Sequence, residues 1–400
     1  MRWIAALLLC ACPSGGGTPD AASPDASRDA PADTTSDREP TDAGDAGGND
    51  IGATLRARDR AVASLLGSDV ARQSTSNGVP VDDTGLIGRN REWGALFSPR
   101  FQLGAGPALR TAIALGDISR ASAAFRAIEV AAETIEADGR VPSDVPPEVA
   151  MGMSLRPADV ASGAAFFLGD ACLGLLALNT ADDADTIASE ARRASVIDAL
   201  GRGAGWLETQ RDLLETVDAR APNRLFHDAV AFQACGVLAN DAMLPVATDF
   251  ANLARAQYDE RGFFIEGGGF DTNYQAVNVV QATELRNAGF ADGTLDTQIA
   301  EGLAWMIDRT SESGAIDSTG NARSCEGCEV FLPGDPPKEV GIVEWLRGLS
   351  YAAVLTGRDT TSAIERFVGW VRSGPSTSCY AQSDDGVLAP LDLTTACASP

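Results

Sequence analysis

The chain has 400 residues and a formal net charge of −25, from 56 acidic side chains against 31 basic ones. This acidity opposes nucleic acid and anionic membrane surfaces as partners, because both carry dense negative charge. It also opposes a long polyanion, unless a local basic groove outweighs the mean charge.

The first twelve residues, MRWIAALLLCAC, place one positive residue before an apolar run that is too short to cross a bilayer as a helix. This pattern predicts a secretory signal. Its end resembles the lipobox of bacterial lipoproteins, in which a cysteine becomes the acylated N-terminus. Cys12 is the better candidate, because Cys10 follows a bulky leucine, and a plain signal peptide is the alternative. Pro13, rather than an aspartate, follows Cys12 and favours the outer membrane of a Gram-negative envelope.

Residues 13–50 contain almost no large apolar side chains, so little in them can offset the entropy cost of ordering. They hold nine acidic residues and two arginines, a net charge of −7, and predict a disordered acidic tether. With Arg2 counted, residues 51–400 keep a net charge of −19. We therefore expect contact with the membrane only through the lipid anchor.

Residues 51–400 show helical periodicity, with alanine and leucine recurring at steps of three and four. Pro157, and also Pro222, occupies a place that suits the first turn of a helix. No linker rich in proline and glycine divides this part of the chain, which predicts a single all-α domain. Helices are predicted over residues 106–116, 118–137, 157–179, 188–217, 226–240 and 243–260.

A loose internal repeat follows three of the predicted helices. In each copy acidic or polar residues precede a glycine and then an extended apolar pair, and the glycines are Gly139, Gly262 and Gly314. Glycine suits the left-handed residue just past the end of a helix. Helix, glycine and extended loop in succession are typical of stacked helical hairpins. The irregular spacing excludes a solenoid of fixed period and favours a curved or closed ring.

Residues 222–280 are similar to the central segment of the α/α-toroid polysaccharide lyases, alginate lyases especially. That family has an asparagine that opens an inner helix, then a loop of the type Asp-x-x-Gly-Phe-φ-x-Glu, then a tyrosine at the next inner helix. Asn223, Glu266 and Tyr274 match these positions. The resemblance implies an (α/α) toroid, an incomplete barrel of helical hairpins. Arg224 stands where the family has histidine, and His227 follows three residues later.

The reaction that the resemblance implies is β-elimination from a uronate. It requires a group that neutralises the substrate carboxylate, a base for the C5 proton and an acid for the leaving oxygen. Asn223 and Arg224 suit the first task, and His227 and Tyr274 the other two. The alternatives are a structural histidine and a surface ion pair of Arg224 with Asp228, four residues on.

The segment FFIEGGGFDTNYQAVNVVQ places Glu266 before three glycines, which permit positive φ and close backbone approach. The next helix carries a narrow polar stripe without lysine or arginine. Uncharged amides on such a stripe favour a substrate-binding groove. The alternative is that the first residue caps the helix and the amides join helices. The stripe consists of Asp271, Tyr274, Asn278 and Gln281.

Asn321 and Arg323 lie in a later loop of the same repeated kind as the loop of Glu266, so we expect them at the same rim. Arg323 can pair with a substrate carboxylate, and a structural arginine is the alternative.

The cysteines that follow the signal point to disulfides, as is usual outside the cytoplasm. A zinc half-site at residues 325–328 is the alternative, but no second pair at knuckle spacing and no histidine supports it. We therefore expect neither metal nor another cofactor. Cys172 and Cys235 lie in apolar segments, as buried thiols or as a bridge between helices. The disulfide candidates are Cys325, Cys328, Cys379 and Cys397.

The expected function is that of an exported, lipid-anchored, lyase-like protein that acts on a polysaccharide or oligosaccharide. The alternative is a non-catalytic lipoprotein that binds glycan or protein on the same scaffold. A third reading is a hydrolase in which Glu266 and Asp271 are paired carboxylates.

Overall fold

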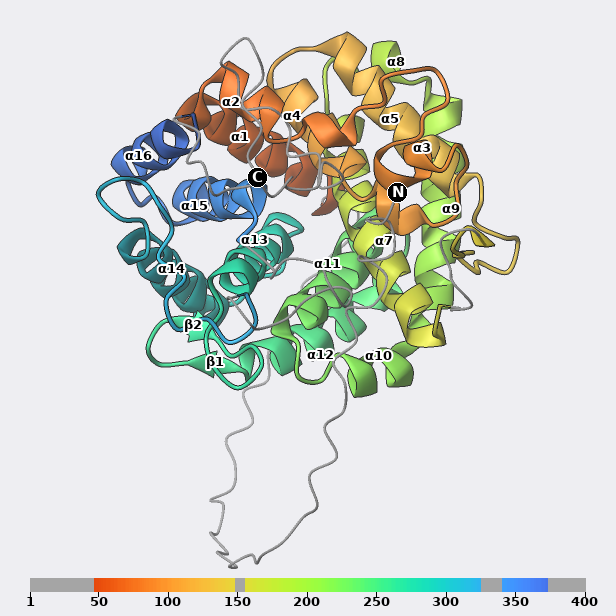
Figure 1. The fold of residues 1–400 in the computed structure, drawn as a ribbon. Coiled ribbons are helices and arrows are strands. Elements are labelled where there is room, and N and C mark those ends of the chain that lie inside the picture. The colour runs from red at the N-terminus through yellow and green to blue at the C-terminus, as the bar shows by residue number, and fades with distance from the viewer. Residues whose placement is uncertain (1–46, 148–154, 325–339, 373–400) are drawn as a thin grey trace, which may run out of the picture.

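The structure is a computed structural model that describes residues 47–147, 155–324 and 340–372 (Figure 1). Most of these residues are helical, so the predicted all-α class is confirmed. Within the described ranges the only strands are β1 (Tyr258–Asp259) and β2 (Phe263–Phe264), which pair antiparallel. Several predictions fall outside the described residues: the signal, residues 13–46 of the tether, and Cys12, Cys325, Cys328, Cys379 and Cys397.

The long helices are α1 (Gly47–Leu66), α4 (Ala105–Ala114), α5 (Ile118–Ala132), α7 (Pro157–Asn179), α9 (Glu190–Glu208), α11 (Pro222–Ala239), α12 (Leu244–Arg255), α13 (Thr272–Asn287), α14 (Gly293–Asp308), α15 (Ile342–Thr356) and α16 (Thr361–Arg372). The short helices are α2 (Ser68–Gln73), α3 (Gly88–Glu92), α8 (Ala184–Ile187) and α10 (Arg211–Val217). Three turns are of the 3₁₀ type: η1 (Ser76–Gly78), η2 (Pro99–Gln102) and η3 (Asp241–Met243).

The helix boundaries agree with several sequence signals. Pro157 and Pro222 each stand in the first turn of a helix, where a missing N–H costs nothing. The predicted helix over residues 188–217 is instead two helices, α9 and α10, because the chain turns at Thr209 and Gln210. The first helix begins at Gly47, inside the stretch predicted to be tether.

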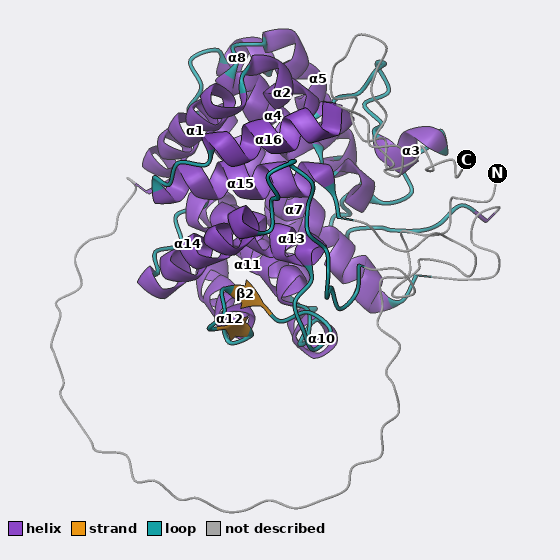
Figure 2. Ribbon diagram, turned by 60° about the vertical axis from the view of Figure 1, so that its left-hand side comes forward, coloured by secondary structure: helices purple, strands orange, loops and turns teal. Residues whose placement is uncertain are grey.

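The inner helices are α1, α4, α7, α11, α13 and α15. In the order α1, α4, α7, α11, α13, α15 each packs against the next, and α15 packs against α1. The helices α5, α9, α12, α14 and α16 each pack on one or two inner helices and lie towards the periphery in Figure 1. Figure 2 shows that helices make up most of the described fold. One hydrophobic core cluster extends from Leu55 to Val371.

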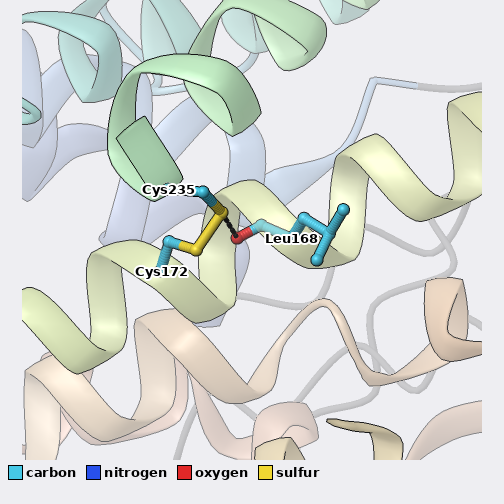
Figure 3. Close-up of a disulfide and its surroundings, with 3 residues drawn as sticks. All are labelled: Leu168, Cys172 and Cys235. Atoms are coloured by element: carbon cyan, nitrogen blue, oxygen red, sulfur yellow. Dashed lines mark hydrogen bonds between the residues drawn. A yellow bond between two sulfur atoms is a disulfide. The ribbon is translucent and has the colours of Figure 1, made fainter. Parts of the chain in front are cut away.

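Helix α7 is buried along almost its entire length, because small residues let its neighbours approach closely. A Cβ on Gly169 would lie 3.3 Å from the backbone N of Ala231 in α11. The same two helices are joined by the disulfide Cys172–Cys235, so the bridge alternative is correct (Figure 3). Among the described helices only α7 is long and apolar enough to span a membrane, and it is a core helix.

The three repeated glycines end four-residue turns of the same kind. Each has positive φ, at +85° for Gly139, +95° for Gly262 and +89° for Gly314. In each turn the glycine N–H donates to the carbonyl three residues earlier, over 2.9 to 3.0 Å. These turns lie several residues beyond the ends of α5, α12 and α14, so the prediction of a residue just past the helix end was wrong.

Each repeated turn packs on a later peripheral helix in the same way. The first contact of a Cβ added to the glycine is a helix carbonyl, at 2.2 Å for Arg202 of α9, 3.4 Å for Glu301 of α14 and 2.0 Å for Arg366 of α16. The next side chain contacted belongs to a tryptophan four residues further on. These tryptophans are Trp206, Trp305 and Trp370. The same packing contact between a glycine turn and a later helix therefore occurs three times.

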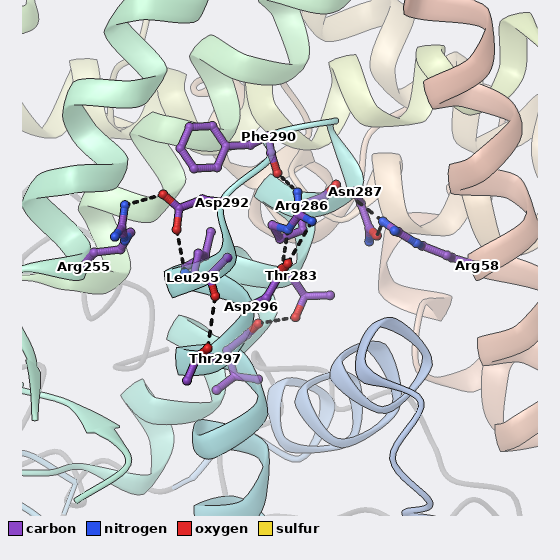
Figure 4. A network of polar contacts seen from close by, with 12 residues as sticks. Arg58, Arg255, Thr283, Arg286, Asn287, Phe290, Asp292, Leu295, Asp296 and Thr297 are labelled. Carbon is purple, nitrogen blue, oxygen red and sulfur yellow. Dashed lines mark hydrogen bonds and ion pairs between the residues drawn. The ribbon is translucent and has the colours of Figure 1, made fainter. Parts of the chain in front are cut away.

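A polar network stabilises the C-terminal end of α13 (Figure 4). Arg286 pairs with Asp296 of α14 over 3.1 Å, and Arg58 of α1 donates to Asn287 over 2.8 Å. Arg286 lies twelve residues beyond Tyr274, about 18 Å along the helix axis. The network is thus at the opposite end of α13 from the residues predicted to form a site.

Candidate functional site

The three glycines after Glu266 form a tight hairpin turn. Glu266 N donates to Gly269 O over 2.8 Å, and Gly269 N donates to Glu266 O over 3.1 Å. Gly267 and Gly268, the two central residues, have φ of +61° and +87°. Two central residues with positive φ are typical of a type I′ turn, which strongly prefers glycine. The turn leaves the Glu266 side chain fully buried.

Asp271 caps α13 and also holds a distant loop. One carboxylate oxygen accepts from the backbone N–H groups of Asn273 and Tyr274, over 3.1 and 3.2 Å. The other accepts from the N–H groups of Arg323 and Ser324, over 2.9 and 2.6 Å. These four bonds account for Asp271 as a structural residue, so we assign it no ligand contact. They also oppose the hydrolase reading, which needs its carboxylate free to react.

Asn321 has the same joining role at this point. Its Oδ1 accepts from Thr272 N over 3.0 Å, and its Nδ2 donates to Thr272 Oγ1 over 2.7 Å and to Ser324 O over 2.9 Å. The amide thus joins the loop after α14 to the start of α13. Asn321 thus lies at the predicted rim, where it holds the loop after α14 against α13.

Arg323 connects two of the predicted site residues. Its Nη1 donates to Glu266 Oε2 over 2.9 Å, and its Cζ lies 3.9 Å from the centroid of the Tyr274 ring. Burial raises the pKa of Glu266 to about 7, although Arg323 and the backbone N–H of Asn223 act to lower it. Asn223, Glu266, Arg323 and Tyr274 therefore meet where α11 and α13 begin.

Arg224 lies on the interior side of α11 and is almost fully buried. Its Nη1 donates to Asp218 Oδ1 over 2.9 Å, so the expected surface pair with Asp228 is replaced by a buried pair with Asp218. Burial first, and then the neighbouring Asp218, raise the pKa of Asp228 well above its ordinary value. This end of α11 therefore gathers several ionisable side chains inside the protein.

His227 is held as a neutral ring. It stacks on Phe166 of α7, with ring centroids 3.8 Å apart, and Arg100 lies over that same phenyl ring at 4.7 Å. Burial lowers the pKa of His227 to about 3, with further lowering by the charges of Arg100, Arg347 and Arg224. Each of these three charged neighbours is an arginine, in a chain that is strongly acidic overall.

The polar stripe of α13 points into the protein. Asn278 is fully buried and Gln281 is 4% exposed. Neither polar atom of the Asn278 side chain has a hydrogen-bond partner in the described part of the chain, and neither does Gln281 Oε1. By contrast, the buried Gln275 of the same helix uses both polar atoms, with Phe264 N and Gly262 O as partners. The amide that joins α13 to the β1–β2 hairpin is thus distinct from the amides of the stripe.

Sequence reasoning missed the charged residues beyond the stripe. Glu284, three residues after Gln281, accepts from Arg110 Nη1 of α4 over 2.8 Å, and Arg110 forms a bidentate pair with Asp59 of α1. Arg347 Nη2 of α15 lies 3.5 Å from Glu284 Oε1. The position of Glu284 on the helix was the one available signal. Its partners are too far away in sequence for periodicity to reveal them.

Asp170 of α7 is a second buried carboxyl in this interior. Burial raises its pKa to about 7, against the lowering effects of Arg347 and Arg110, and Glu284 adds to the rise. At neutral pH this group can therefore gain or lose a proton as the surrounding charge changes.

In the described ranges, no group of three or more histidine, cysteine or acidic side chains is arranged to hold a metal ion. The site therefore consists of one neutral imidazole, a phenol, several amides and buried ion pairs. Comparison with known protein families, curated proteins and solved structures found no match to this chain.

Proposed function

We propose that this protein binds a uronate-containing oligosaccharide where α11 and α13 begin, and cleaves it by β-elimination. The observation that carries the proposal is the set of arginines around the neutral His227: Arg100 lies over the Phe166 ring that stacks on His227, and the charges of Arg224 and Arg347 also act on it. A cluster of this kind in a chain of net charge −25 favours a local anionic ligand over a long polyanion. The amide of Asn223 and the phenol of Tyr274 belong to the same end of these helices.

The site residues divide naturally between the tasks of the reaction. The Asn223 amide and the Arg224 guanidinium can neutralise the substrate carboxylate, which makes the C5 proton more acidic. His227, with a pKa of about 3, is too weak a base to remove that proton efficiently at neutral pH. We therefore assign both proton transfers to Tyr274, whose ring is held by Arg323. Its phenolate form takes the C5 proton, and the resulting phenol returns that proton to the leaving oxygen, which regenerates the phenolate.

We further propose that the helices form an (α/α) toroid, as the resemblance to alginate lyases implies. The succession of contacts around the inner helices supports this arrangement. The three glycine turns that pack against tryptophan-bearing helices support it as well, because neighbouring units of a repeat structure pack on each other through equivalent contacts.

A second candidate function is glycan binding without catalysis on the same scaffold. The observation that favours it is the pairing of Arg323 with Glu266. Nη1 of Arg323 already donates to Glu266, whereas in an active lyase this guanidinium could bind a substrate carboxylate. This candidate predicts uronate binding by the wild type with no unsaturated product.

We also propose that the protein is exported and anchored through Cys12. The buried disulfide Cys172–Cys235 supports an oxidising compartment, where such bridges persist. The test is fractionation of cells that express the full chain. Wild-type protein should partition with membranes, and Cys12→Ala should release it; equal partitioning of both would contradict the anchor.

The experiment for activity is incubation of the purified protein with alginate, polygalacturonate and polyglucuronate, followed by ultraviolet absorbance of the unsaturated product. Tyr274→Phe should abolish product formation while uronate binding persists. The matched control is Tyr258→Phe, because the Tyr258 hydroxyl contacts Glu301 outside the site. Equal rates for wild type and Tyr274→Phe would refute the role of Tyr274. Binding without product from the wild type would favour the non-catalytic function.

A further inference from the structure

We infer that the site continues inward along α13 as a closed subsite for one end of an acidic sugar chain, formed by Asn278, Gln281 and Arg347. This inference rests on the proposed function. It adds the mode of recognition: the protein would take the end of a chain, and a carboxylate near that end would meet Arg347.

The first argument is the lack of partners for buried polar groups. Nearly all buried polar atoms in folded proteins are hydrogen-bonded, because an unpaired one loses its hydration without compensation. Asn278 leaves both polar side-chain atoms unpaired, Gln281 leaves Oε1, and Arg347 leaves Nε and Nη2 without a hydrogen bond among the described residues. A ligand that offers hydroxyl and carboxylate groups would satisfy all of them.

The second argument is the position of these side chains along α13. Helices α13 and α15 pack together, and two contacts bracket the stripe. Near the rim, Gly341 N donates to Asn273 Oδ1 over 2.8 Å. Further inward, Arg347 Nη2 approaches Glu284 Oε1 at 3.5 Å. Asn278 and Gln281 lie along α13 between these contacts.

The third argument is that the stripe ends at a saturated ion-pair cluster. Glu284 Oε1 is held by Arg110, and Glu284 Oε2 accepts from Asn287 Nδ2 over 3.0 Å. Arg110 in turn donates to both carboxylate oxygens of Asp59. All of these side chains are at least nine-tenths buried. A ligand that follows the unpaired groups from Asn278 inward therefore stops at Glu284.

The chemistry of the unpaired donors and acceptors specifies the ligand class. Nε and Nη2 of Arg347 make no hydrogen bond among the described residues, although Nη2 lies 3.5 Å from Glu284 Oε1, and such donors suit a carboxylate. The Asn278 amide can both donate and accept, as a sugar hydroxyl requires. From Tyr274 to Gln281 the helix rises about 10 Å, so the subsite accommodates only a short terminal segment.

The first experiment compares affinity with stability, using calorimetric titration with short oligouronates prepared from the three polymers. Asn278→Leu and Gln281→Leu remove unpaired polar atoms at similar volume. We expect affinity to fall about tenfold or more, with an unchanged or higher melting temperature. The matched control is Gln233→Leu on α11, a buried glutamine whose Nε2 donates to Ala288 O over 3.2 Å. It should lower the melting temperature and leave the affinity of the folded protein unchanged.

The second experiment titrates the protein with short and long preparations of whichever uronate polymer binds. A chain-end subsite predicts the same number of bound proteins per polymer chain at both lengths. A number that grows with chain length would overturn the inference and leave uronate binding intact. Unchanged affinity in Asn278→Leu and Gln281→Leu would also overturn it, and would indicate that bound water fills these positions. Failure of every uronate to bind the wild type would instead refute the proposed function.

Discussion

The Arg323 guanidinium lies over the ring of Tyr274, with Cζ 3.9 Å from the ring centroid, and it also donates to Glu266 over 2.9 Å. These residues come from the loop after α14, the first turn of α13 and the hairpin before α13. One cation therefore connects three segments that are separated by up to 57 residues in sequence. The position of the Tyr274 phenol depends on this connection, and the following predictions concern the contacts that maintain it and the surrounding scaffold.

Replacement of Asp271 by alanine should destabilise the protein more than the loss of an ordinary helix cap. A cap contributes about 1 kcal/mol, and the N–H groups of Arg323 and Ser324 would also lose their acceptor. We expect a total loss of about 2–4 kcal/mol in the free energy of unfolding, measured by urea titration. The matched control is Asp117→Ala, which removes the α5 cap that accepts from Arg120 N. Equal losses in the two variants would contradict the joining role.

The free energy of unfolding should depend on the ionisation of Glu266, and the sign follows from its raised pKa. The pKa is about 7 in the folded protein against an ordinary value of 4.5, so the folded state retains the proton longer. The stability due to this carboxyl is complete below pH 4.5 and is lost as the pH rises through 7. Glu266→Gln should therefore gain in melting temperature relative to wild type as pH rises. Glu190→Gln, at an exposed position, supplies the baseline. A difference that shrinks as pH rises would show that the ion pair with Arg323 outweighs burial.

Removal of the Arg110 guanidinium should be severely destabilising. Asp59 and Glu284 would remain buried without their main partner, and breaking a buried ion pair in this way costs about 3–5 kcal/mol. Thermal unfolding of Arg110→Met measures the loss. The partly buried surface residue Arg211, which pairs with Glu215 and Asp249, is the control, and Arg211→Met should lose at most about 1 kcal/mol. A double variant, Asp59→Asn with Arg110→Met, should recover part of the stability; no recovery would argue against uncompensated charge as the cause.

Loss of the Cys172–Cys235 bridge should lower stability by about 2–5 kcal/mol, because it closes a loop of 63 residues in the unfolded chain. Denaturant titration of the double variant Cys172→Ala, Cys235→Ala measures this. Both sulfurs are fully buried between α7 and α11, so a mild reductant should leave the native wild type unchanged. Rapid reduction of the native protein would contradict this burial.

Several parts of the fold could be predicted because their causes are local. Pro157 and Pro222 indicated helix starts, and Asp271 indicated a helix cap. The buried environment of Arg224 could not be predicted, because the four-residue spacing to Asp228 is typical of a surface ion pair, whereas the actual partner is Asp218. The repeated tryptophans were visible in the sequence, but only packing on the glycine turns relates them to one another.

The amino-acid sequence by itself determined the helical class, the helix starts at Pro157 and Pro222, the sharp turn at the triple glycine and the polar stripe of α13. Each of these depends on backbone geometry and on spacing within a few residues. Only the tertiary structure decided that Arg323 meets Glu266 and Tyr274, that Arg100 and Arg347 act on His227, and that Glu284 ends the stripe. The reason is physical. Burial sets the strength of these charges and the cost of unpaired amides, and burial arises only when helices distant in sequence pack together.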